Sequence, residues 1–234
     1  MINKELLKTL SDDIGVSLDS EALLRFDTYA EELVETNKVM NLTGITKPDE
    51  IVLKHFVDSL ELLKYAQISV GASVIDVGTG AGFPGVPLLI ARGDIQLTLL
   101  DSLQKRLSFL QKVLDVCKLS ANCVHMRAED GGKDLSLRET FDIATARAVA
   151  PLNILAEYTL PFVKVGGALY ALKGTGEDIK LSEAAIRELG GELAAEYQYE
   201  LPNGDKRMIV YVKKISQTPT RYPRKAKKIT ANPF

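Results

Sequence analysis

Apolar side chains recur at helical spacing through the first part of the chain. Between residues 20 and 40 they fall on one helical face, formed by Ala22, Leu23, Phe26, Ala30, Leu33 and Val34. A second stripe follows Pro48 and runs through Ile51, Val52, His55, Phe56, Ser59, Leu60 and Leu63. His55 and Asp58 are polar positions three residues apart near this stripe. The pattern predicts a helical extension over residues 1–66, in which His55 is either a satisfied buried histidine or part of a site.

The pattern changes at Ala72 to short apolar runs that alternate with amphipathic segments. The runs predict parallel strands over residues 73–77, 95–101, 122–126, 141–146 and 168–172, with helices between them. Two further strand-like runs, 193–201 and 207–213, flank Pro202-Asn203-Gly204-Asp205, and an Asn-Gly pair in that position is a strong hairpin signal. We therefore predict an α/β fold with a mostly parallel seven-stranded sheet that ends in an antiparallel hairpin. Residues 67–215 would form this domain, followed by a tail over 216–234.

A glycine-rich turn follows the first predicted strand. Gly78, Gly80 and Gly82 give the spacing G-x-G-x-G, and Phe83 stands where a dinucleotide fingerprint has its third glycine. Such a turn lets a backbone approach a ligand closely. Asp101 ends the next strand, where a carboxylate can bind both hydroxyls of a ribose. The motif is similar to the cofactor site of class I methyltransferases, which bind S-adenosylmethionine, although a turn that only packs helix on sheet has the same glycines.

Charge is distributed unevenly along the 234 residues. The net charge is −2, but residues 213–234 contain seven Lys and Arg and no acid, so the remainder of the chain carries −9. The tail is either a polyanion-binding segment, with Tyr222 able to stack on a base, or a solvated disordered segment. Neither a signal peptide nor a bilayer-spanning apolar run is visible, and Cys117 and Cys123 form no disulfide framework. We expect a cytoplasmic, monomeric protein that binds no membrane.

The predicted strand ends supply the remaining candidates for chemistry. Glu129, beside Ala128, could accept from an adenine amino group, or it is a solvated loop acid. Arg147 could bind a phosphate, a guanine O6 or the methionine carboxylate of a cofactor, or it forms a structural salt bridge.

Several classes of methyl transfer lack their usual residues. The turn after the fourth strand is Thr145-Ala146-Arg147-Ala148, not the Asp/Asn-Pro-Pro-aromatic turn typical of base-amine methylation. Both cysteines are best interpreted as packing residues, so pyrimidine carbon-5 methylation is disfavoured. No metal-ligand cluster is visible. What remains is an acceptor with a free lone pair, such as guanine N7.

Several motifs together resemble the RsmG (GidB) family of bacterial rRNA methyltransferases. They are Asn41-Leu42-Thr43, His55-Phe56-Val57-Asp58-Ser59, residues 76–85, Leu100-Asp101-Ser102, Arg127-Ala128-Glu129, Ala146-Arg147-Ala148 and Ala171-Leu172-Lys173-Gly174. The resemblance implies S-adenosylmethionine contacts at Gly78, Phe83, Ala128, Glu129 and Arg147. It places Asn41, Thr43, His55 and Asp58 against the cofactor cleft, and we take Asn41, His55, Asp58 and Arg147 as candidate catalytic residues.

The resemblance also implies the substrate. Family members methylate guanine N7 at position 527 of 16S rRNA, so 16S rRNA, the 30S subunit or its precursor is the expected partner. The tail departs from the family at Lys227-Lys228-Ile229-Thr230, where a Gly-x-Pro run is common. Two other functions remain: a nicotinamide-dependent oxidoreductase, indicated by the glycine turn and Asp101, and a catalytically silent RNA-binding module, indicated by the tail.

Overall fold

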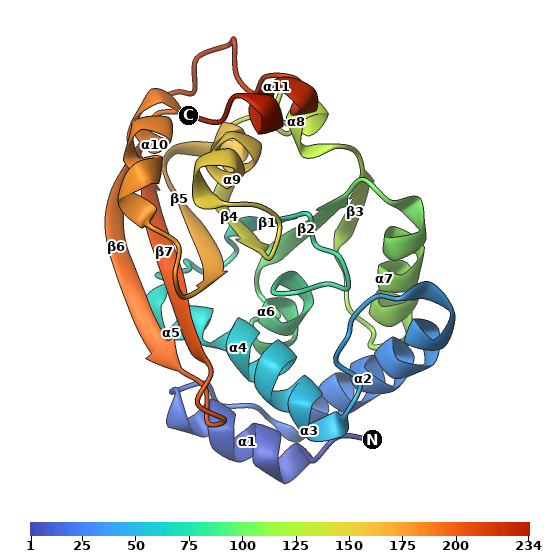
Figure 1. Cartoon of the computed structure of the whole chain (residues 1–234). Coiled ribbons are helices and arrows are strands. Elements are labelled where there is room, and N and C mark those ends of the chain that lie inside the picture. Colours follow the sequence, from blue (N-terminus) through green and yellow to red (C-terminus); the bar gives the residue numbers. More distant parts are fainter.

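Seven strands form one sheet in the computed structural model, which describes all of residues 1–234 (Figure 1). The strand order is β3-β2-β1-β4-β5-β7-β6. The strands are β1 (Ser73–Val77), β2 (Gln96–Asp101), β3 (Asn122–His125), β4 (Phe141–Arg147), β5 (Val163–Gly174), β6 (Gly191–Glu200) and β7 (Lys206–Lys214). The first five are parallel, and β7 is antiparallel to both of its neighbours. The predicted fold class is confirmed.

Helices cover both faces of the sheet, so successive residues of a strand enter different cores. In β1, Val74 joins one apolar cluster and Ile75 the other. The first cluster is completed by the N-terminal helices, α6 (Gly85–Ala91) and α7 (Gln104–Val116). The second includes side chains of α9 (Leu152–Thr159) and α10 (Glu183–Glu188), while α8 (Ala128–Gly131) lies on the same side. Burial on both faces explains why the parallel strands are continuous apolar runs.

The N-terminal segment is helical, as predicted, but its second part is not one regular helix. It contains α1 (Lys4–Asp13), α2 (Ser20–Met40), α3 (Pro48–Ile51), α4 (Asp58–Leu60) and α5 (Leu62–Tyr65). A π-helical segment, Val52–Val57, separates α3 from α4. A π turn is wider than an α turn and is frequent at functional sites. No helix in the molecule is both long enough and apolar enough to span a bilayer.

The predicted C-terminal hairpin is confirmed. The residues between β6 and β7 include Gly204, whose φ of +85° suits a tight turn. In the register of the sheet, Arg207 at the start of β7 pairs with Tyr199 of β6 and with Gly174 of β5. Because β7 is antiparallel to β5, its first residues lie at the carboxyl edge of the parallel strands, where ligands bind in such sheets.

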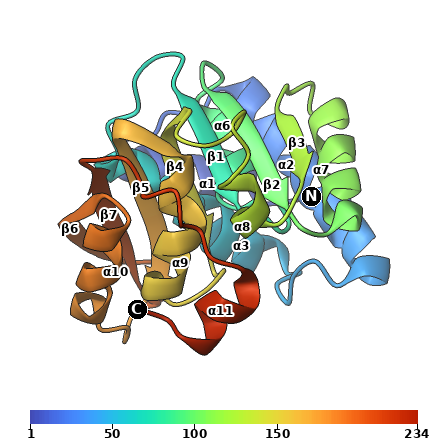
Figure 2. The ribbon, with the colours of Figure 1, turned by 90° about the horizontal axis from the view of Figure 1, so that it is seen from above.

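The last residues fold back onto the body and are not a disordered tail. A short helix, α11 (Ala226–Ala231), lies beside α9 (Figure 2). Tyr222 is buried against Phe234, and Ile229 is fully buried. The Arg138 guanidinium donates to the carbonyl oxygens of Thr218 and Tyr222 at 2.6 and 2.9 Å. The disordered interpretation is therefore wrong, and Tyr222 is not available to stack on a base.

Two buried ionic contacts anchor the C-terminal segment, residues 213–234. Lys214 is fully buried, and its Nζ donates to the Leu160 carbonyl at 2.7 Å and to Glu139 at 3.1 Å. Burial lowers the pKa of Lys214 to about 8. The Arg224 guanidinium donates to both carboxylate oxygens of the fully buried Glu157. Arg221 pairs with Glu188, whereas the other cations of residues 213–234 are exposed: Lys213, Lys225, Lys227 and Lys228.

Candidate active site

The glycine turn after β1 is held by a buried carboxylate. The Asp76 Oδ2 accepts from the Thr79 hydroxyl at 2.6 Å and from the Gly85 N–H at 3.0 Å. Burial raises the pKa of Asp76 to about 6, against the opposing effect of these two bonds. Gly78 has a φ of +70°, and a Cβ added there would lie 2.9 Å from the Val149 Cγ2. The turn therefore requires glycine both for its backbone conformation and for the space above it.

Beside this turn, at the carboxyl ends of β1 and β2, lies a cavity of 290 Å³. Its walls include four of the predicted cofactor-binding residues: Gly78, Asp101, Ala128 and Glu129. The Asp101 carboxylate accepts from the Gly80 N–H at 3.0 Å and from the Leu103 N–H at 2.8 Å. It therefore also fixes the glycine turn from the side of β2.

Phe83 lies below the turn and does not line this cavity. Its ring is 5% exposed and stacks on the rings of His55 and Tyr29, with centroids 4.3 and 5.4 Å away. The Tyr29 hydroxyl donates to the Ala81 carbonyl. The aromatic stack thus connects α2 and the π-helical segment to the glycine turn.

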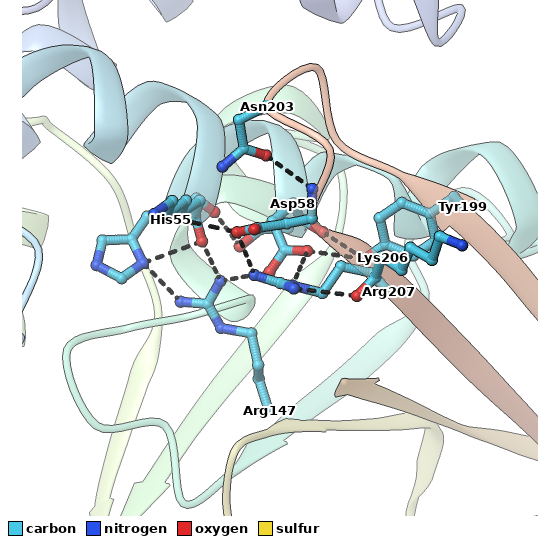
Figure 3. A network of polar contacts seen from close by, with 10 residues as sticks. His55, Asp58, Arg147, Tyr199, Asn203, Lys206 and Arg207 are labelled. Atoms are coloured by element: carbon cyan, nitrogen blue, oxygen red, sulfur yellow. Dashed lines mark hydrogen bonds and ion pairs between the residues drawn. The ribbon is translucent and has the colours of Figure 1, made fainter. Parts of the chain in front are cut away.

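The Arg147 side chain joins β4 to the π-helical segment (Figure 3). Its Nη1 donates to the Asp58 Oδ2 at 2.9 Å and to the Lys54 carbonyl at 3.0 Å, and its Nη2 donates to the His55 Nδ1 at 3.0 Å. The guanidinium carbon lies 4.8 Å from the Phe83 ring centroid. Three of the predicted catalytic residues, His55, Asp58 and Arg147, are therefore in direct contact.

These contacts define the protonation state of His55. The Arg147 guanidinium, 3.0 Å from Nδ1, can only donate, whereas the Lys54 carbonyl, 3.2 Å from the same nitrogen, can only accept. The shorter Arg147 contact favours the tautomer in which Nδ1 accepts and the ring proton is on Nε2, 2.8 Å from the Thr43 Oγ1. Burial, reinforced by the Arg147 charge, lowers the pKa of His55 to about 3. The imidazole is therefore neutral at physiological pH, with its lone pair already used.

Because His55 is neutral in the folded chain, the free energy of unfolding depends on pH. From about pH 6.5 to 3 the unfolded chain binds a proton at His55 that the folded chain does not. We expect the free energy of unfolding to fall as the pH falls through this range, and His55→Gln to reduce that dependence. Denaturant titrations at several pH values measure the first effect, and NMR titration measures the ring directly. Protonation of His55 in the folded protein near pH 6 would contradict the assignment.

A second cavity of 490 Å³ lies on the other side of Ala148, which lines both cavities. Its walls include His55, Asp58, Arg147, Lys173 and Arg207. The Lys173 Nζ donates to the Ala150 carbonyl at 2.7 Å and pairs with Glu177. The two cavities form adjoining compartments, one beside the glycine turn and one rich in cationic side chains.

Not every predicted residue belongs to this site. Asn41 ends α2 with a φ of +50°, its side chain is exposed, and it lines neither cavity. Conversely, Tyr199 and Arg207 contact Asp58 and were not among the predicted site residues. The signal available for them was the hairpin itself, since its second strand must begin at the carboxyl edge of the sheet.

Comparison with known proteins assigns the chain. A family model for rRNA small subunit methyltransferase G, GidB, matches residues 23–199. The chain belongs to the GidB family. Ribosomal RNA small subunit methyltransferase G of Leuconostoc citreum is 48% identical over 220 residues, covering 92% of both chains. The protein with the same description from Clostridium beijerinckii is 45% identical over 234 residues, covering 98% of both chains.

Membership in the GidB family confirms the predicted family and decides against a nicotinamide-dependent oxidoreductase. The fold is also similar to a solved structure of a candidate methyltransferase from Bacillus halodurans, with a TM-score of 0.54 and 13% sequence identity. That match covers 68% of this chain and 99% of the other. The protein is thus an rRNA small subunit methyltransferase with a class I methyltransferase fold and an added N-terminal helical layer.

Proposed function

We propose that this GidB-family protein uses S-adenosylmethionine to methylate guanine N7 at position 527 of 16S rRNA, acting as a monomer in the cytoplasm. The observation that carries the proposal is the pair of adjoining cavities, because methyl transfer requires a donor site and an acceptor site in direct contact. The one beside Gly78 takes the donor and the one beside Arg207 takes the base.

The chemistry of the smaller cavity fits S-adenosylmethionine. Gly78 leaves a cradle that any Cβ would fill, and Asp101 and Glu129 offer carboxylates to ribose hydroxyls and to an adenine amino group. When bound, the cofactor would supply a methyl group on a sulfonium sulfur, which would leave as a neutral thioether as the acceptor lone pair forms its bond to the methyl carbon. Asp101 also fixes the backbone of the turn at Gly80, and the turn in that conformation orients the donor.

The protonation states of the larger cavity favour an acceptor that needs no base. His55 is neutral with Nδ1 engaged, and the Asp58 carboxylate is paired with Arg147, so neither is free to remove a proton. Guanine N7 has no proton at neutral pH, whereas an exocyclic amine must lose one. The residues act by orienting the base and excluding water.

Incubation of the protein with 30S subunits, or with 16S rRNA, and methyl-labelled S-adenosylmethionine tests the proposal. We expect label on N7 of one guanine, and none with a Gly78→Arg variant, whose side chain would enter the donor cavity. Label on an exocyclic amine or a ribose would contradict the assignment. Binding of RNA without any transfer would instead favour a catalytically silent module.

We also propose that the exposed lysines of the C-terminal segment bind the RNA backbone. Lys227 and Lys228 lie on α11, and Ala226 of the same helix lines the donor cavity. Changing both lysines to glutamine is expected to reduce the salt-dependence slope of RNA binding by roughly 1.5, because each phosphate contact releases counterions. Filter binding at several salt concentrations measures this. Lys8→Gln with Lys112→Gln, on α1 and α7, is the charge-matched control, and an unchanged slope for the α11 variant would remove these lysines from the interface.

A further inference from the structure

The buried Asp58 carboxylate is contacted from two separate parts of the fold. Asp58 is 4% exposed, and its Oδ2 accepts from Arg147 of β4. Its Oδ1 accepts from the Tyr199 hydroxyl of β6 at 2.8 Å and lies 3.6 Å from the Arg207 Nε of β7. A buried charge is stable only when it is paired and hydrogen-bonded. The C-terminal hairpin therefore supplies the partners of one oxygen, and β4 supplies the partner of the other (Figure 3).

The hairpin holds these two side chains in fixed positions. Tyr199 and Arg207 are direct partners in the β6–β7 register, and the Arg207 Nη2 is restrained by the Asp205 carboxylate at 3.1 Å. Burial and the nearby Asp58 charge raise the pKa of Tyr199, so the phenol stays protonated and donates a hydrogen bond to the carboxylate. The Tyr199 ring also contacts Tyr65 of α5, with a centroid distance of 6.4 Å.

We propose that Tyr199 and Arg207 are positioning residues for methyl transfer. They act through the Asp58 carboxylate, which fixes the Arg147 guanidinium against Phe83 and His55 in the wall of the larger cavity. If Oδ1 loses its partners, the carboxylate is free to rotate about its side-chain torsions, and Oδ2 no longer holds Arg147 in one orientation. This inference rests on the proposed function, since it concerns the rate of that reaction.

Tyr199→Phe removes only the hydroxyl that reaches Asp58. We expect it to lower kcat about tenfold, the loss that corresponds to one hydrogen bond to a charged group, with the KM for S-adenosylmethionine nearly unchanged. The matched control is Tyr197→Phe. Tyr197 is two residues earlier on the same strand, stacks on Tyr65 at 4.6 Å, and its hydroxyl has no hydrogen-bond partner in the protein. This control is expected to keep full activity.

A double-mutant cycle separates positioning from simple stabilisation. In an Asp58→Asn background, Tyr199→Phe is expected to cause no further loss of kcat, because the group through which the hydroxyl acts is already changed. The same tenfold loss in both backgrounds would overturn the inference. In the wild-type background, the ¹⁵N-detected NMR resonance of the Arg147 guanidinium should shift with Tyr199→Phe and not with Tyr197→Phe.

The outcomes distinguish this inference from the proposed function. A folded wild-type protein that transfers no methyl group to 16S rRNA would contradict the proposed function itself. An active wild type whose Tyr199→Phe variant keeps its kcat, and leaves the Arg147 resonance in place, would overturn only the positioning role. Calorimetric titration with S-adenosylmethionine confirms that each variant still folds and binds the donor.

Discussion

Replacing Arg147 by methionine is expected to lower methyl transfer to 16S rRNA about 100- to 1000-fold, as removal of a preorganised electrostatic group typically does. The side chain is the one group that contacts His55, Asp58 and Phe83 together. Methionine keeps much of its length but leaves the Asp58 carboxylate without its closest cation. We therefore also expect a lower melting temperature, because one oxygen of a buried carboxylate loses its charged partner while Tyr199 and Arg207 contact only the other oxygen.

Initial rates with labelled S-adenosylmethionine at saturating RNA measure the effect. Arg147→Lys is expected to recover only part of the activity, since one ammonium cannot reproduce the two-nitrogen contact with His55 and Asp58. Arg187→Met is the control, because Arg187 pairs with Glu183 on α10 and lines neither cavity. Activity of Arg147→Met within tenfold of wild type would show that the guanidinium is not central to the reaction.

Replacing Arg224 by alanine is expected to destabilise the fold by about 3–5 kcal/mol, the cost of leaving a buried carboxylate without its partner, and so to lower the Tm by roughly 10 °C. Glu157 is fully buried within α9, and Arg224 contacts both of its oxygens. The loss is expected to release Tyr222 from the second apolar cluster and α11 from its contact with α9. Thermal melting followed by circular dichroism measures the first effect, and proteolysis of the C-terminal segment measures the second.

Arg221→Ala is the matched control for this prediction. Arg221 belongs to the same segment and also pairs with a glutamate, but its side chain is 67% exposed. Ion pairs on the surface contribute little to stability because water screens them. We expect no measurable change in Tm, and a similar loss for both arginines would show that the segment is held by something other than the buried Glu157 pair.

The sequence was sufficient to predict the sheet and the residues that meet around the smaller cavity. A run that ends in Gly78-Thr79-Gly80, a strand that ends in Asp101, and a third that leads to Ala128 and Glu129 must meet at one edge when the strands are parallel. The hairpin was equally visible, since Asn203-Gly204 lies between two β-like runs. These features depend on local chemistry and on the geometry of parallel sheets, both of which are encoded over short distances along the chain.

The rest of the site depends on contacts between distant residues and was not predictable in the same way. The spacing of His55 and Asp58 suits an ordinary helix, and nothing local indicates the π-helical segment that places both against Arg147. Tyr199 is 141 residues from Asp58 along the chain. The sequence left two interpretations of the C-terminal segment open for a related reason: its composition is compatible with solvation, but distant groups, Glu157 and the surrounding apolar side chains, hold it against the body.

If the glycine turn binds the methyl donor as proposed, the aromatic stack beneath it makes the affinity for that donor depend on the N-terminal helices. Tyr29 lies under Ala81, and Phe26 and Phe56 extend the same column of rings away from the sheet. The N-terminal helices thus support the conformation of the glycine turn through these rings. Truncation of the N-terminal helices, or a partner protein that displaces α2, would then lower the affinity for the methyl donor without altering any residue that contacts the donor.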